Sequence, residues 1–139
     1  MYQAHFTLSS MKNIPAKIFA RQYEIRDEFL KEIDKHLLDL TEGRTQEMFE
    51  IRDFASIMNI HPTHLSNTIK VTTNKSPCYF FEEKILDIAK GMLAKNEMSI
   101  GAIATLLTYD PSNFTKFFKA YTKLTPKQYR EQCLLEQFV

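Results

Sequence analysis

The sequence predicts an all-α fold in which two similar helical units are joined by a central helix. Apolar residues recur at helical spacing along most of the chain, and its 139 residues include only three glycines and five prolines. Two similar nine-residue stretches also lie 49 residues apart, PTHLSNTIK from position 62 and PSNFTKFFK from position 111. Two copies at one spacing indicate two tandem subdomains, and two copies are too few for a solenoid.

Each copy is predicted to form two short helices around a tight turn. In the first copy, Ile51, Phe54 and Met58 have the spacing of one helical face. Asn59 follows, and asparagine tolerates the left-handed backbone that ends a helix. Pro62 then suits the first turn of the next helix, where no backbone N–H is needed.

The second copy repeats this pattern with different turn residues. Its first helix is predicted to begin near Ile100, and Thr108 makes the turn. Asp110 can cap the next helix, which opens at Pro111. Both copies therefore predict a helix-turn-helix, in which the second helix can lie in a DNA major groove.

An amphipathic helix is predicted ahead of the two units, from about Arg21 to Leu40. Ile25, Phe29, Ile33 and Leu37 recur on one face, and charged residues fill the other positions. This helix either covers the core or serves as a dimerisation or partner helix. Residues 2–10 read either as a short strand or as a disordered arm.

A longer helix from Pro77 to Lys95 is predicted to link the two units. At about 1.5 Å per residue it is roughly 25–30 Å long, close to the roughly 34 Å helical turn of B-DNA. Gly91 lies inside it and is interpreted as a point of close packing, and residues 72–76 before it as a polar loop. The predicted organisation is residues 1–44, arm and amphipathic helix; 45–76, first unit; 77–95, linking helix; and 96–139, second unit with a final helix.

Composition predicts a soluble, cytoplasmic protein. The apolar fraction of 44% can supply a core, yet no apolar run reaches the length of a membrane span and the N-terminus lacks a signal peptide. Cys78 and Cys133 lie far apart, which favours free thiols. Net charge is only +1, but residues 60–139 hold ten Lys and Arg against seven Asp and Glu, so the basic excess lies in the half that contains both proposed recognition helices.

Enzymatic chemistry and metal binding are not predicted. The sequence shows no carboxylate pair, no nucleophile with its base and no glycine-rich phosphate loop, so neither an enzyme nor a cofactor is expected. His61 and His64 have no further ligands at metal-binding spacing, so no metal is expected either. Phe117 and Phe118 are assigned to the core rather than to base stacking.

The stretch IATLL…PSNFTKFFKAYTKLTPKQYR resembles the C-terminal DNA-binding domain of AraC/XylS-type regulators (the arabinose-operon type), over about residues 48–131. The resemblance is carried by matching pairs in both units, which are Phe54-Ala55, His64-Leu65, Ser76-Pro77, Phe118-Lys119, Thr125-Pro126 and Tyr129-Arg130. The family usually has glycine where Asn74, Thr108 and Lys123 stand. Asparagine is the next-best residue for a positive φ, and threonine is less comfortable there.

The resemblance implies homeodomain-like three-helix units and a transcription regulator that binds double-stranded DNA, with RNA polymerase as a further partner. Only about 48 residues precede the match, so the chain is either a small stand-alone regulator or a piece of a longer one. A rival hypothesis is a helical protein–protein interaction module on the same fold, motivated by the near-zero net charge. The target site, effector, direction of regulation and oligomeric state stay open.

Outward-facing polar residues on the second helix of each unit are the candidate DNA contacts. The resemblance assigns base-facing positions to Thr63, Ser66, Asn67, Ser112, Asn113, Thr115 and Lys116. Phosphate contacts are expected from His64, Lys70, Lys75 and Lys119.

Overall fold

The computed structural model describes residues 16–138, and all of the regular structure in that range is α-helical. The helices are α2 (Ala16–Thr41), α3 (Ile51–Ile57), α4 (Pro62–Thr73), α5 (Pro77–Lys95), α6 (Ile100–Leu106), α7 (Pro111–Thr122) and α8 (Pro126–Glu136). The prediction of two helix-turn-helix units, a linking helix and an amphipathic N-terminal helix is confirmed. The prediction of a strand or an arm at residues 2–10 lies outside the described residues.

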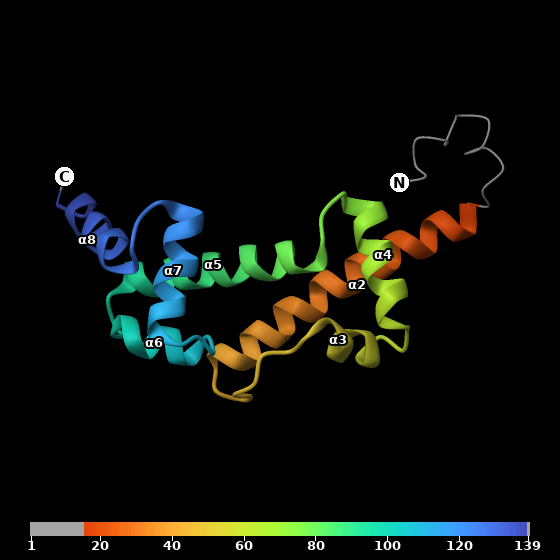
Figure 1. Cartoon of the computed structure of the whole chain (residues 1–139), viewed down its shortest axis with the longest axis horizontal. Helices are drawn as coiled ribbons and strands as arrows, with labels where there is room; N and C mark the ends of the chain where they lie inside the picture. Colours follow the sequence, from red (N-terminus) through yellow and green to blue (C-terminus); the bar gives the residue numbers. More distant parts are fainter. Residues whose placement is uncertain (1–15, 139) are drawn as a thin grey trace.

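The amphipathic helix α2 covers the first unit. Its apolar face is fully buried along Ile25, Phe29, Ile33 and Leu37, and it packs mainly against α4 and also contacts α3 and α5. In Figure 1, α2 (orange) crosses the molecule diagonally beneath α5. Within the described residues the helix already runs from Ala16, about five residues before the predicted start near Arg21, because hydrophobic periodicity locates helix ends less well than helix centres.

The first unit pairs α3 with α4. Asn59 has a φ of 58°, and the N–H of Ile60 donates to the carbonyl of Ala55 (3.0 Å), so the chain reverses in one tight turn. Helix α4 extends to Thr73, whereas residues 72 and 73 were predicted to belong to a loop. The Thr73 hydroxyl donates to the carbonyl of Ile69 (2.6 Å), and Asn74 in the left-handed conformation ends the helix.

The second unit repeats this geometry. Thr108 has a φ of 66°, and the N–H of Tyr109 donates to the carbonyl of Ala104 (2.8 Å). The Thr122 hydroxyl donates to the carbonyl of Phe118 (2.8 Å), and Lys123 ends α7 in the left-handed conformation. The internal repeat in the sequence is therefore also a repeat of backbone turns and side-chain hydrogen bonds.

Helix α5 has the predicted bounds and carries one unit at each end (Figure 1). Its 19 residues span about 28 Å at the rise of an α-helix. Lys84 pairs with Asp34 of α2 (2.6 Å), which ties the linking helix to the N-terminal helix. Gly91 is exposed and a side chain there would meet nothing, so the expectation of close packing at this glycine is wrong.

Arg130 of α8 fixes the junction between α5 and the second unit. Its guanidinium donates to the carbonyl of Leu93 (3.1 Å) and to that of Met98 (2.6 Å). Leu93 lies in the last turn of α5 and Met98 in the connection to α6. Charge-assisted hydrogen bonds of this kind are the stronger ones. The last helix therefore acts as a clamp on the second unit.

Candidate nucleic-acid interface

The first recognition helix, α4, is held with one polar face outward. His61 caps its start, because the imidazole Nδ1 accepts a hydrogen bond from the N–H of Thr63 (3.1 Å). Leu65 and Ile69 are fully buried against the core. The helical period then turns the opposite side to solvent. The predicted contacts that it leaves exposed are Thr63, His64, Asn67 and Lys70, and Ser66 is half-buried beside them.

The second recognition helix, α7, is oriented by aromatic side chains. Phe114 and Phe118 are fully buried, and Tyr109 stacks on Phe117 with ring centroids 5.1 Å apart. The Asp110 carboxylate caps the helix by accepting from the N–H of Ser112 (3.1 Å). The predicted contacts that α7 leaves exposed are Ser112, Asn113, Lys116 and Lys119, and Thr115 is half-buried.

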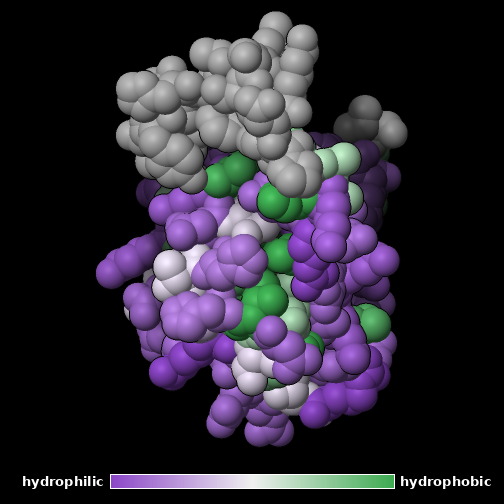
Figure 2. Space-filling model, turned by 90° about the vertical axis from the view of Figure 1, so that its right-hand side faces the viewer, coloured by the Kyte–Doolittle hydropathy of each residue, from purple (hydrophilic) through white to green (hydrophobic). Residues whose placement is uncertain are grey.

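The fold brings the predicted residues together as two separate groups, one on each recognition helix. Helices α4 and α7 stand at opposite ends of α5 and run in the same direction (Figure 1). Figure 2 faces the end of the molecule that carries α4, whose surface is mostly hydrophilic with scattered hydrophobic patches. Lys75 lies in the turn after α4, with its ammonium 4.8 Å from the centre of the Tyr79 ring, where it remains exposed.

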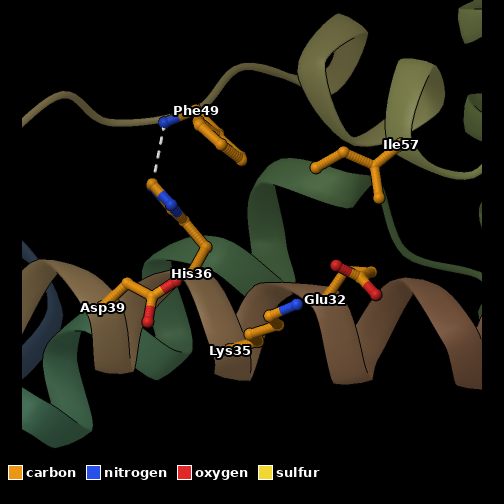
Figure 3. Close-up of a pocket in the computed structure, with 6 residues that line it drawn as sticks. All are labelled: Glu32, Lys35, His36, Asp39, Phe49 and Ile57. Atoms are coloured by element: carbon orange, nitrogen blue, oxygen red, sulfur yellow. Dashed lines mark hydrogen bonds between the residues drawn. The ribbon is translucent and has the colours of Figure 1, made fainter. Parts of the chain in front are cut away.

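The sequence interpretation missed His36, which positions the first unit from α2. The backbone N–H of Phe49 donates to Nε2 of His36 (3.0 Å), and the two rings stack with centroids 3.9 Å apart (Figure 3). His36 thereby fixes the segment that leads into α3. The sequence signal that could have revealed it is a histidine on the apolar face of this helix, three residues after Ile33 and four before Leu40.

Burial lowers the pKa of His36, while the carboxylates of Asp39 and Asp53 act in the opposite direction. The neutral ring is the form that can accept the Phe49 hydrogen bond. A cavity of about 300 Å³ adjoins this ring, and Glu32 and Lys35 line it together with His36 (Figure 3).

Tyr121 at the end of α7 is joined to the linking helix. Its hydroxyl donates to the carboxylate of Glu82, and this bond, together with burial, raises the pKa of Tyr121 to about 12. The contact links the end of α7 to α5.

Neither a metal site nor a membrane span is present in the part of the chain that the structure describes. Within residues 16–138, no three His, Cys, Asp or Glu side chains gather as metal ligands would. No helix in the same range has both the length and the apolar character needed to cross a bilayer. Cys78 and Cys133 are free thiols, as predicted.

A family profile described as a helix-turn-helix domain matches residues 54–132, which is more than half of the chain and includes both recognition helices. The match agrees with two earlier observations, the two helix-turn-helix units of the structure and the residue pairs that carry the family resemblance. The chain belongs to the AraC/XylS-type helix-turn-helix family. The family of this AraC/XylS-type domain is thus a family of DNA-binding domains and not a family of enzymes.

Two curated relatives share about the same level of identity with this AraC/XylS-type domain. A histidine kinase of Formosa agariphila is 30% identical over 115 residues, which are 78% of this chain and 8% of that protein. An uncharacterized helix-turn-helix transcriptional regulator of Bacillus subtilis is 31% identical over 85 residues, 60% of this chain and 35% of that protein. The chain therefore spans only a small part of the relatives that it matches.

A solved structure shows the same fold as this AraC/XylS-type domain. A DNA-binding transcriptional dual regulator from Escherichia coli K-12 aligns with a TM-score of 0.68 at 19% identity, covering 80% of this chain and 93% of that one. At such low identity the likeness establishes the arrangement of helices, and the contacts of the present chain follow from its own residues.

Proposed function

We propose that this protein is a sequence-specific DNA-binding transcription regulator that inserts α4 and α7 into successive major-groove segments. The observation that carries the proposal is the pair of polar-faced recognition helices at the two ends of the roughly 28 Å α5. That length approaches the roughly 34 Å that separates adjacent major grooves on one face of B-DNA. The family membership of the chain supports the same ligand.

We propose two roles for the outward residues. Short polar side chains can hydrogen-bond base edges, and asparagine can pair bidentately with adenine. The proposed base readers are Thr63, Ser66, Asn67, Ser112, Asn113, Thr115 and Lys116. Phosphate contacts supply affinity and salt dependence with little sequence information, and we assign them to His64, Lys70, Lys75 and Lys119.

The remaining features of the proposal follow from DNA as the ligand. Residues 45–76 and 96–139 act as the two DNA-contacting subdomains and residues 77–95 set their spacing. Within the N-terminal segment 1–44, helix α2 covers the first subdomain. Transcription regulation makes RNA polymerase a candidate protein partner, and we propose a cytoplasmic location for the protein. Regulators of this kind need no cofactor for the contact itself.

Selection of preferred duplexes from a random pool, at low and at moderate salt, tests the proposal. A bipartite motif with two blocks about one helical turn apart is the expected result. Absence of any enrichment, together with salt-insensitive binding, would remove the proposal and favour a protein–protein interaction module.

Two substitutions separate the proposed readers from the proposed phosphate contacts. Asn67→Ala is expected to relax sequence preference and to weaken binding to the preferred duplex by about 1–3 kcal/mol. Lys119→Ala is expected to weaken binding to all duplexes alike and to reduce the salt slope by about one. Both side chains are exposed, so the fold should be unchanged. Identical behaviour of the two variants would contradict the division.

A further inference from the structure

The start of α7 carries three oxygen-bearing side chains whose hydrogen-bonding capacity is already partly used. The Ser112 hydroxyl donates to Oδ2 of Asp110 (2.7 Å), and the Thr115 hydroxyl donates to the carbonyl of Pro111 (3.1 Å). A hydroxyl has one hydrogen and two acceptor lone pairs. Each of these two oxygens can therefore accept a further hydrogen bond from a ligand but has no hydrogen left to donate.

Asp110 adds an acceptor of the same kind. Its hydrogen bonds with Ser112 and with the backbone N–H groups of Ser112 and Asn113, and its proximity to Lys116, lower the pKa of its carboxyl group, although partial desolvation opposes them. An ionised carboxylate offers about four lone-pair sites and no donor. Asp110 is exposed and has capacity for a further donor. Asp110, Ser112 and Thr115, here called the acceptor group, thus present only acceptors.

The first unit has different chemistry at the matching positions. His61 stands where Asp110 stands in the second unit, and Thr63 and Ser66 match Ser112 and Thr115. Because Nδ1 of His61 accepts from the N–H of Thr63, the neutral ring carries its hydrogen on Nε2, which is a donor. The start of α4 therefore presents a donor where the start of α7 presents a carboxylate.

Base edges in the major groove distinguish these two surfaces. Cytosine offers its N4 amino group and adenine its N6 amino group, whereas guanine and thymine offer acceptors. The first residues of a recognition helix are those that contact base edges, and a carboxylate pairs naturally with cytosine N4. Opposite guanine O6 or thymine O4, an acceptor-only group would leave both partners unpaired.

We infer that Asp110 is a specificity-determining residue that selects an amino-bearing base, cytosine in first place, at one position of the second half-site. The inference rests on the proposed DNA-binding function and extends it. It predicts an asymmetric target, because the matching position of the first half-site faces His61 and has no such preference.

Reciprocal substitutions at the two capping positions test this inference. Asp110→Asn keeps an effective helix cap but places an amide donor in the group, and His61→Asp transfers the carboxylate to the first unit. Each full-length variant is put through random-duplex selection beside the unchanged protein. Thermal unfolding of each variant checks that the fold is kept.

The unchanged protein is expected to enrich cytosine at one position of the second block, and to bind roughly tenfold more weakly when thymine replaces it. Asp110→Asn should reduce that ratio to about threefold or less while the first block is unchanged, and His61→Asp should create a cytosine preference in the first block.

Removal of the negative charge by Asp110→Asn should also tighten binding to all duplexes, and this general change is separated from the base preference by comparing ratios within each variant. Two outcomes would overturn this inference while leaving the proposed function in place. One is that Asp110→Asn enriches the same base as the unchanged protein, and the other is that the unchanged protein shows no base preference in the second block. Failure of every protein to enrich any duplex would overturn the proposed function and this inference with it.

Discussion

The two helix-turn-helix units have the same backbone turns but different residues in them. In the first unit, both left-handed positions are asparagine, at Asn59 (φ 58°) and Asn74 (φ 61°). In the second unit they are Thr108 (φ 66°) and Lys123 (φ 69°). A β-branched side chain at positive φ is strained, whereas asparagine is several-fold enriched there. Packing of the unit therefore imposes the turn, and the residue that occupies it decides how much strain is stored.

The units also differ in what holds them. The first lies under α2, where His36 and Phe29 contact Phe54 edge to face. Within residues 16–138, the second unit is held instead by its own aromatic residues, by the Tyr121–Glu82 hydrogen bond to α5 and by the Arg130 clamp. Two similar helix pairs can thus bury the same apolar face against different elements, because each pair needs only some second layer of structure to cover that face.

The largest expected effect is the loss of the buried aromatic anchor of the second unit. Phe114→Ala should lower the free energy of unfolding by about 3–5 kcal/mol, because Phe114 is fully buried and truncation leaves a cavity. Leu65→Ala is the matched change in the first unit, with an expected loss of about 2–5 kcal/mol. Urea denaturation monitored by circular dichroism measures both. A loss below about 1 kcal/mol for Phe114→Ala would contradict the aromatic-anchor account.

Exchange of the turn residues tests the strain comparison directly. Thr108→Asn should stabilise the protein by roughly 1 kcal/mol, because asparagine adopts the left-handed conformation more readily than threonine. Asn59→Thr should destabilise it by a similar amount. Thermal and urea unfolding of both variants give the two signs. Equal effects of the same sign would show that backbone strain is not what distinguishes the turns.

A smaller gain is expected in the linking helix that both units share. Gly91→Ala should stabilise the protein by up to about 1 kcal/mol, because Gly91 is exposed inside a helix and the added methyl group meets no neighbour. Gly43→Ala is the control. It also has open space, but its φ of 79° disfavours alanine, so this change should destabilise. Calorimetric unfolding distinguishes the two signs.

The most gradual effect is a pH dependence near neutrality that comes from His36 of α2, the residue that holds the start of the first unit. Because the folded-state pKa of His36 lies below the 6.5 of the unfolded chain, the unfolded state takes up a proton first as pH falls. Stability is therefore full above about pH 6.5 and declines as pH falls toward the folded-state pKa.

Measurement of the unfolding free energy over roughly pH 8 to 5 tests this dependence. The matched control is His36→Gln, whose amide oxygen can still accept a hydrogen bond. This variant keeps the charged groups around position 36, which are Asp39, Asp53, Glu32 and Lys35. That variant should lose most of the decline between about pH 6.5 and 5. Parallel curves for the two proteins would assign the pH dependence to other groups.

Much of the fold was predictable because its signals are local. The linking helix has its predicted bounds, since Pro77 opens it and Asn96 closes it in the left-handed conformation. The inward faces at Leu65 and Phe114 follow from helical period alone. For the candidate interface, helical periodicity predicted which side chains face outward. Which of these side chains contact DNA stays a prediction.

By itself, the sequence determined the helices, the turns, the repeat and the polar face of each recognition helix, because each depends on residues within one or two helical turns. Tertiary structure alone decided the contacts between distant residues. His36 meets Phe49 thirteen positions away, and Arg130 reaches carbonyls 32 and 37 positions away. It also set the common direction of α4 and α7, since the orientation of two helices is fixed by what each packs against rather than by their own periodicity.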